Sequence, residues 1–295
     1  MLKRSLVFTS PVMLSLKNNQ LVATYKDMPD VIKTVPIEDI GTILIESQMT
    51  SITMPLINAL ADSNVCCIIC NRKDMPNVML QPFDSNNTQC ETLHNQIAIG
   101  NVLKKQLWKQ IIEAKIRNQS LLLCKLGKNG GLLKPHYCNV KSGDSDNREG
   151  QAAKLYWSEL FGNNFVRDRD SDGVNSLLNY GYSILRAATA RAIVSSGLYP
   201  GLGLFHHNRS NAFPLADDLM EPYRPYVDEI VYGLFQEGNS SLTKSTKIDL
   251  IHTLYCDTKF GKVTRPLSVG LSFTTASLVR CFNKDASVID FPVMK

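Results

Sequence analysis

The chain has 295 residues, of which 44% are hydrophobic and 20% charged, and its formal net charge is +5. This length can bury one large hydrophobic core or two smaller ones, and two domains are favoured at this size. The charged fraction and the ordinary glycine and proline contents exclude a mostly disordered chain. The mild positive charge fits a polyanionic partner, although many enzymes with other partners share it.

The apolar runs, the N-terminal residues and the cysteines together indicate the compartment and the redox state of the thiols. No run of about 18 apolar residues occurs, so the sequence predicts no membrane-spanning helix, and residues 1–16 lack a secretory signal pattern. Eight cysteines are scattered along the chain, which predicts reduced thiols in a cytoplasm. Cys67 and Cys70 have a C-x-x-C spacing, but in an apolar strand they would face opposite sides. We therefore expect them to be buried rather than to bind zinc.

The first eighty residues have the pattern of short β-strands. An Asn-rich segment at residues 17–20 predicts a tight turn between two strands. Residues 54–61 predict one short helix with Pro55 in its first turn. The predicted strands occupy residues 7–16, 21–25, 31–36, 42–46 and 65–70.

Helical periodicity replaces the strand pattern after a polar, turn-rich segment at residues 82–90, which is the predicted linker. The predicted helices occupy residues 103–114, 152–160, 176–196, 215–232 and 247–254. The sequence therefore predicts an α+β protein with a small β-rich N-terminal domain at residues 1–81. A larger all-α domain at residues 91–295 follows it.

Three segments of the predicted helical domain carry side chains that could hold a metal ion. Glu149 lies in or just before the first turn of a helix, where a carboxylate is favoured. His206 and His207 are adjacent after a glycine-rich apolar stretch. Glu221 precedes Pro222, which predicts a kink or an end of the helix there.

Asp217 and Asp218 precede Glu221 by four and three residues, so on a helix an aspartate shares its face. Each segment alone has an ordinary explanation: a capping acid, a solvated or core histidine, or a solvated acidic face. Together, two carboxylates and an imidazole suggest one divalent site that suits Mn²⁺ or Mg²⁺ better than structural Zn²⁺. Such an ion beside a phosphodiester stabilises charge on its oxygens.

These segments resemble the three metal-ligand motifs of the CRISPR-associated integrase that inserts new spacers, the Cas-one family. The elements that carry the resemblance are Glu149-Gly150 before Tyr156 and Trp157, residues 203–206, and residues 218–225. Residues 10–21 and 178–182 are similar to members from type II systems, so the resemblance covers nearly the whole chain.

The resemblance implies that Glu149, His206 and Glu221 are the catalytic residues and metal ligands of a metal-dependent DNA endonuclease and integrase. The family motif has a single histidine, so His207 is the lesser candidate. Asp217 and Asp218 would lie behind the ligands.

Further expectations concern the fold, the partners and the reaction. A β domain followed by an α-helical domain, a homodimer and an assembly with the small Cas-two protein are implied, with cooperation of the type II effector nuclease. Each active site would join a 3′-hydroxyl of a short double-stranded DNA to a phosphodiester of the CRISPR repeat.

Basic residues supply candidate phosphate contacts. The predicted helix that contains Lys115 and Arg117 could follow a DNA backbone or could be a solvated face. The candidate contacts are Lys104, Lys105, Lys109, Arg209 and Arg224. Two other functions stay open: a nuclease that uses water at the same metal site, and a DNA-binding scaffold without catalysis.

Overall fold

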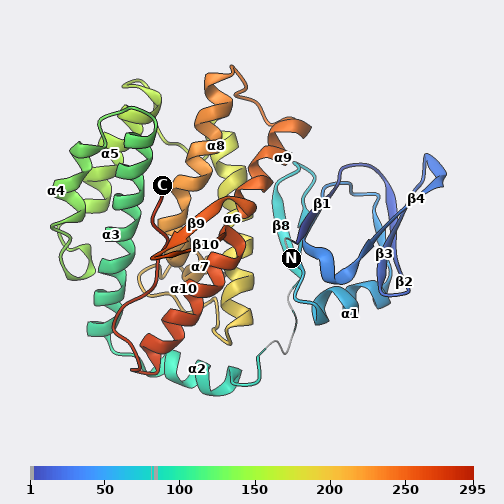
Figure 1. The fold of residues 1–295 in the computed structure, drawn as a ribbon, viewed down its shortest axis with the longest axis horizontal. Coiled ribbons are helices and arrows are strands. Elements are labelled where there is room, and N and C mark those ends of the chain that lie inside the picture. Colours follow the sequence, from blue (N-terminus) through green and yellow to red (C-terminus); the bar gives the residue numbers. More distant parts are fainter. Residues whose placement is uncertain (1–2, 81, 83–85) are drawn as a thin grey trace. The chain divides into compact units, whose positions relative to one another are not determined.

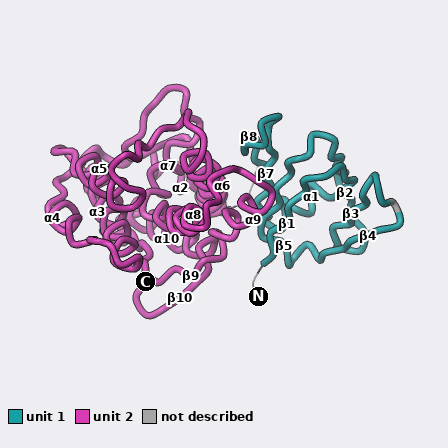
Figure 2. Tube along the Cα trace, turned by 90° about the horizontal axis from the view of Figure 1, so that it is seen from above, with its two compact units in different colours: residues 1–85 teal, residues 86–295 magenta. Residues whose placement is uncertain are grey.

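The computed structural model describes residues 3–80, 82 and 86–295 (Figure 1). The chain forms two compact units, residues 1–85 and 86–295 (Figure 2). Of the predicted linker, residues 83–85 lie outside the described residues, and its last two residues belong to the first helix of the second unit. None of the helices in the described ranges combines the length and apolarity needed to span a membrane. All eight cysteines are free thiols.

The described residues of the N-terminal unit form two four-stranded sheets. In the first, with the order β1-β5-β7-β8, the first three strands are parallel and β8 is antiparallel. In the second, with the order β4-β3-β2-β6, only β2 and β6 are parallel. The elements are β1 (Arg4–Phe8), β2 (Val12–Lys17), β3 (Gln20–Tyr25), β4 (Met28–Pro36), η1 (Ile37–Asp39), β5 (Ile40–Ile45), β6 (Ser51–Ile52), α1 (Met54–Asp62), β7 (Cys66–Cys70) and β8 (Pro76–Leu80).

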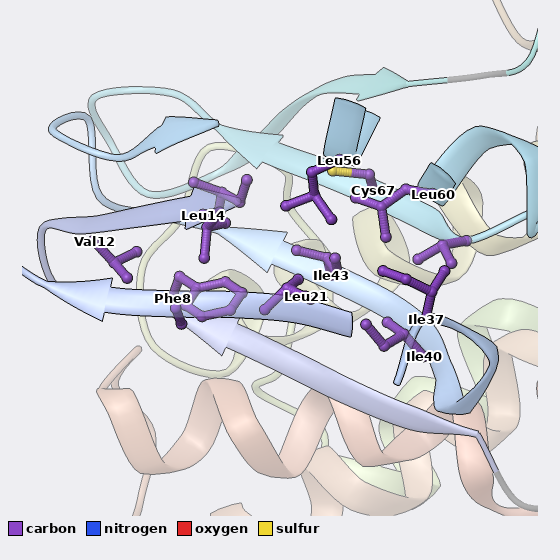
Figure 3. Close-up of a cluster of buried hydrophobic side chains, with 13 residues drawn as sticks. Phe8, Val12, Leu14, Leu21, Ile37, Ile40, Ile43, Leu56, Leu60 and Cys67 are labelled. Carbon is purple, nitrogen blue, oxygen red and sulfur yellow. The ribbon is translucent and has the colours of Figure 1, made fainter. Parts of the chain in front are cut away.

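One hydrophobic core joins the strands of both sheets and α1. Phe8 of β1, Leu14 of β2, Ile43 of β5 and Leu56 of α1 gather in it (Figure 3). Because side chains alternate along a strand, each of these strands contributes its inward-facing apolar residues. Cys67 belongs to the same core, and burial raises the pKa of its thiol to about 12, so the thiol packs as an apolar group.

The tight turn at residues 17–20 is confirmed, but the predicted strand at residues 7–16 is two strands. Asn18 and Asn19 have φ values of 50° and 57°, which Asn tolerates and which this hairpin turn requires. Chain direction changes between β1 and β2, where Pro11 has no N–H to donate, and the two strands belong to different sheets. The polar pair Thr9 and Ser10, followed by Pro11, was the available signal of this break.

The described part of the second unit is mainly helical. Its elements are α2 (Gln89–Ala98), α3 (Asn101–Lys125), η2 (Gly130–Leu133), α4 (Lys134–Tyr137), η3 (Ser142–Asp144), α5 (Arg148–Phe161), α6 (Val174–Ser195), α7 (Pro214–Met220), η4 (Glu221–Tyr223), α8 (Arg224–Gln236), α9 (Lys244–His252), η5 (Thr253–Tyr255), β9 (Asp257–Phe260), β10 (Val263–Pro266) and α10 (Leu267–Phe282).

Two long helices organise this unit. Helix α6 packs against α7, α8, α9 and α10, while α3 contacts α4, α5, α8, η3 and η4. In Figure 1, α3 runs beside α4 and α5. The elements that carry the predicted metal ligands, α5 and η4, therefore both meet α3.

The C-terminal part differs most from the sequence-based expectation. The predicted helix at residues 215–232 is interrupted at Pro222 by η4, as the proline predicts. The antiparallel pair β9–β10 and the 16-residue helix α10 were not predicted. The last residues lie along α3, where Gln110 Oε1 accepts from the Ile289 N–H at 2.9 Å and Asn118 Oδ1 accepts from the Met294 N–H at 3.1 Å.

The first prediction concerns the N-terminal core. Ile43→Ala should lower the free energy of unfolding by about 2–5 kcal/mol, because it leaves a cavity at a fully buried position. Ile32→Ala is the matched control, since Ile32 is 60% exposed, and should change stability by less than about 0.5 kcal/mol. Chemical denaturation followed by circular dichroism measures both. Equal effects of the two substitutions would contradict the assigned core.

Candidate metal centre

Glu149 is positioned by the N-terminal cap of α5. Asn147, with φ 53°, accepts from the Gly150 N–H through Oδ1 at 3.1 Å. Asp144 accepts from the N–H groups of Arg148 at 2.8 Å and Glu149 at 3.1 Å. A Cβ at Gly150 would lie 2.7 Å from Asn147 Oδ1, so the cap excludes larger residues there. Other groups thus cap the helix, and the Glu149 side chain is left to contact α3.

Glu221 lies where α7 gives way to the short 3-10 turn η4. Pro222 cannot continue the regular helix, and the backbone turns there. The Asn118 amide of α3 donates to the Pro222 carbonyl at 2.7 Å, which fixes this turn against α3. The Glu221 side chain is only 5% exposed.

Lys115 of α3 bridges the two glutamates. Its Nζ lies 2.5 Å from Glu149 Oε1 and 2.6 Å from Glu221 Oε2. Burial alone lowers the pKa of the Lys115 ammonium, but the carboxylates of Glu221 and Glu149 more than offset this, and the pKa lies above its ordinary value. The ammonium therefore stays charged and holds the two carboxylates together.

Arg224 makes a second contact with Glu221. Its guanidinium Nη2 lies 2.9 Å from Glu221 Oε1, and its plane lies over the Tyr182 ring at 4.5 Å from the centroid. Burial raises the pKa of Glu221, but the Arg224 and Lys115 cations outweigh it, so the pKa lies below its ordinary value. Glu221 is thus a fixed anion.

Asp218 shapes the loop that carries His206. Its carboxylate accepts from the backbone N–H groups of Leu204, Phe205 and His206 at 2.6, 3.1 and 3.3 Å. It also lies 2.6 Å from His206 Nδ1, and this hydrogen bond raises the pKa of His206. When Nδ1 carries the proton, Nε2 is left as the metal-binding nitrogen.

A glycine permits this close loop. A Cβ at Gly203 would lie 2.6 Å from the His206 carbonyl and 3.0 Å from Asp218 Oδ2. Beside it, the Phe205 ring stacks on Trp108 of α3 with centroids 4.3 Å apart, while His206 meets the Trp108 ring edge-on. Of the two adjacent histidines, His206 is thus held by α3 and Asp218, whereas His207 is exposed.

The structure brings the predicted ligands toward one another but not into a closed metal cluster. Glu149 and Glu221 converge on Lys115, and His206 is near enough for its charge to influence the pKa of Glu221. Within the described residues, no three Asp, Glu, His or Cys side chains lie close enough together to hold a metal ion.

The donor set nevertheless fits a divalent cation. Glu221 Oε2 is buried, and its partner in the described part of the chain is the Lys115 ammonium, 2.6 Å away. Two carboxylates and one imidazole held by a carboxylate are ligands that Mn²⁺ and Mg²⁺ accept. These three residues could hold such an ion if Lys115 moved aside.

The other predicted residues have separate environments. Asp217 pairs with Arg186 at 2.7 Å instead of facing the glutamates. Lys109 pairs with Glu113 at 3.6 Å on the surface, and the Lys105 side chain lies against Gly143, in the loop that leads to α5. The remaining basic candidates are the half-buried Lys104 and the exposed Arg209.

A buried carboxylate that sequence reasoning missed lies behind Arg224. Asp228 accepts from the Tyr156 hydroxyl at 2.7 Å and from the Tyr182 hydroxyl. Burial raises the pKa of Asp228 to about 6, against the effect of the two tyrosines and of Arg224 and Arg167. Tyr182 is therefore a core residue, and its aromatic face supports the arginine that holds Glu221.

The fold and this site define a class: a β-rich unit followed by a helical unit that carries two glutamates and a histidine. A sequence model of the family described as "CRISPR associated protein Cas1" matches residues 6–250. The "CRISPR-associated endonuclease Cas1" of Neisseria meningitidis serogroup C (strain 8013) is 40% identical over 256 residues, covering 85% of this chain and 83% of the relative. The chain therefore belongs to the Cas1 family, which confirms the predicted resemblance to the Cas-one family.

Solved structures share the fold. One described as "Casposase bound to integration product" matches with a TM-score of 0.79 at 22% identity, over 99% of this chain and 93% of that chain. Another, described as "Cas6-RT-Cas1--Cas2 complex", matches with a TM-score of 0.72 at 18% identity, over 97% of this chain and 35% of that chain.

Asp218→Ala should lower the free energy of unfolding by about 2–5 kcal/mol, because three backbone N–H groups and the His206 ring lose their common acceptor. Asp170→Ala, at an exposed loop position, is the control and should have an effect below about 0.5 kcal/mol. Urea titration measures both. An Asp218→Ala variant with the wild-type midpoint would show that this carboxylate does not hold the loop.

The raised pKa of Asp228 predicts a pH-dependent contribution to stability. The folded protein binds the proton more tightly than the unfolded chain, so this contribution is present below about pH 4 and is lost as pH rises through about 6. The unfolding free energy of the wild type minus that of Asp228→Asn should therefore fall between these values and then level off. A flat Asp228 profile would refute the assignment.

Proposed function

We propose that this chain is a metal-dependent DNA endonuclease and integrase that inserts short duplex spacers into a CRISPR repeat. The observation that carries the proposal is the convergence of Glu149 and Glu221 on one buried cation, next to a histidine held by Asp218. Membership of the Cas1 family and the endonuclease name of the 40% identical relative support it.

Glu149, Glu221 and His206 would hold Mn²⁺ or Mg²⁺ in this proposal. The bound ion would supply positive charge beside the phosphodiester oxygens. Other residues of the chain would orient and hold the three ligands. Asp218 orients the His206 ring, Arg224 keeps Glu221 ionised and in place, and the caps of α5 hold Glu149 at the start of its helix.

The proposed reaction is a transesterification. A 3′-hydroxyl of the incoming duplex attacks a phosphodiester of the repeat, a new phosphodiester forms, and the repeat strand leaves with a free 3′-hydroxyl. Bonds of the same kind form and break, so no external energy source is required. With water as the attacking group, the same site would only cleave, and this nuclease reaction is the second candidate.

Exposure indicates the side from which DNA would approach. The side chains of Glu149 and His206 are 29% and 40% exposed, whereas those of Glu221 and Asp218 are 5% and 0% exposed. A polyanion therefore meets the Glu149 and His206 side of the site. Basic residues on α3 and around the ligand segments would contact its phosphates, and the candidates are Lys104, Lys105, Lys109 and Arg209. Arg224 is not among them, because Glu221 and the Tyr182 ring hold its guanidinium.

The partners belong to the same proposal. Double-stranded DNA is the substrate, and a homodimer would assemble with Cas2 and cooperate with the effector nuclease. The related structures are described as a casposase bound to integration product and as a complex that contains Cas1 and Cas2, which supports DNA and Cas2 as partners.

Removal of either glutamate tests the proposed chemistry. Glu149→Gln and Glu221→Gln should each lower Mn²⁺-dependent strand joining at least about 100-fold, because each removes a negative ligand from the cation site. Glu113→Gln is the matched control, since Glu113 only pairs with Lys109 on the surface of α3, and should join strands at the wild-type rate. A labelled duplex and a supercoiled repeat plasmid, resolved on a denaturing gel, measure the joined product.

The products separate the candidate functions. Covalently joined strands support the integrase, whereas cleaved strands without joining support the nuclease. If neither the wild type nor the variants change the DNA, and the variants bind DNA as the wild type does, only the non-catalytic scaffold remains.

A further inference from the structure

Lys115 occupies an unusual place for a lysine. Its neighbours of the same charge on α3, Lys105 and Lys109, have exposed or half-exposed side chains, but Lys115 is buried. Its ammonium lies within 2.6 Å of one oxygen from each of two carboxylates that come from different elements. A buried ammonium is stable only when paired in this way.

The same oxygens are the ones that a divalent cation would use. Mn²⁺ and Mg²⁺ bind carboxylate oxygens at about 2.0–2.2 Å, with little tolerance for another cation at the same oxygens. Since Lys115 Nζ is 2.5 Å from Glu149 Oε1 and 2.6 Å from Glu221 Oε2, the ammonium and the ion compete for one position.

We infer that Lys115 is a built-in competitor of the divalent cation, which leaves the two glutamates when the ion binds and then pairs with a phosphate of the bound DNA. This inference rests on the proposed function, because it takes Glu149 and Glu221 as metal ligands. Arg224 also contacts Glu221, but through Oε1, so it does not share the contested oxygen. Lys115 can move because its ammonium is carried by a flexible four-carbon chain.

The displaced ammonium links metal binding to DNA binding. A lysine without carboxylate partners near a buried site needs another anion, and a backbone phosphate beside the ion provides one. The cation and the DNA should therefore bind cooperatively, and by thermodynamic linkage each should raise the affinity of the other by the same factor. Without Lys115, only the direct attraction between the ion and the phosphate couples the two binding events, so the linkage should be weaker.

Metal affinity without DNA is the first test. Lys115→Met should bind Mn²⁺ roughly tenfold or more tightly than the wild type, because the competing charge is gone. Its melting temperature should fall without metal, since two carboxylates lose their cation, and should rise more than that of the wild type when Mn²⁺ is added. Lys125→Met, which removes a surface lysine of the same helix, should leave both values unchanged. Electron paramagnetic resonance of free Mn²⁺ gives the affinities.

Coupling to DNA is the second test. A short duplex should raise the Mn²⁺ affinity of the wild type and of Lys125→Met by about 5–100-fold, and that of Lys115→Met by a clearly smaller factor, since only the attraction between the ion and the phosphates remains. If Lys115 has only a structural role, Lys115→Met should also melt at a lower temperature. Its Mn²⁺ affinity should then be equal to or weaker than that of the wild type, and the duplex should raise that affinity by the same factor as in the wild type. That pattern would overturn the inference.

A measurement on the wild type removes any dependence on the folding of the variant. Amine labelling with quantification by mass spectrometry should show that Mn²⁺ increases the modification of Lys115, because the side chain leaves its buried position. Lys247, which is also buried, is the internal reference and should not change. Unchanged labelling of Lys115 at saturating Mn²⁺ would refute displacement.

The Mn²⁺ affinity of Glu221→Gln distinguishes a failure of this inference from a failure of the proposed function. If Glu221→Gln binds Mn²⁺ as well as the wild type does, Glu221 is not a metal ligand and the proposed function fails.

Discussion

The helical unit is built around one cluster of buried charge, in which Lys115 pairs with Glu149 and Glu221. Taking these groups out of water costs several kcal/mol for each ion unless they are paired closely. The pairing constrains three elements at once, because the charges come from the middle of α3, the first turn of α5 and the short turn η4. Any arrangement that moves one of these elements leaves a buried charge without its partner.

Helix α3 carries the contacts that fix this cluster from behind. Three residues after Lys115, Asn118 lies on a nearby face and is hydrogen-bonded to the backbone of Pro222, next to Glu221, and to the last residues of the chain. Earlier in the helix, Trp108 supports Phe205 and His206. The C-terminal segment and the histidine loop, which are far apart in sequence, therefore depend on the same 25-residue helix.

The sequence allowed the ligand residues to be predicted by type, but not their electrostatic environment. Glu149, His206 and Glu221 were proposed as ligands because carboxylates and an imidazole can bind a metal ion, because Pro222 marks a break in a helix, and because their segments resemble the Cas-one motifs. Lys115 was grouped with the surface lysines of its segment, because helical periodicity gives a residue's face but not the neighbour that covers it. Its apolar neighbours Ile112 and Ile116, both fully buried, were the available signal.

The fold shows a similar division between local and long-range information. The Asn18-Asn19 turn follows from backbone preferences of two residues and could be predicted. The assignment of β1 and β2 to different sheets could not, because it depends on pairing with β5 and β3, which no local pattern specifies. The role of Asp228 could not be predicted from local patterns either. Its tyrosine partners come from α5 and α6 and lie 72 and 46 residues away in sequence.

Glu221 and Glu149 differ in exposure and in the number of their cationic partners, so the site has a buried side and an exposed side. Glu221 is buried and carries two cationic partners, Lys115 and Arg224, with Arg224 in turn supported by the Tyr182 ring above Asp228. Glu149 is more exposed, its side chain pairs with Lys115, and the cap of its helix holds its backbone. A cation that arrives from solvent therefore meets Glu149 and His206 first and a fixed anion behind them. The buried side supplies rigidity, while the exposed side has the freedom to rearrange when Lys115 gives up its position.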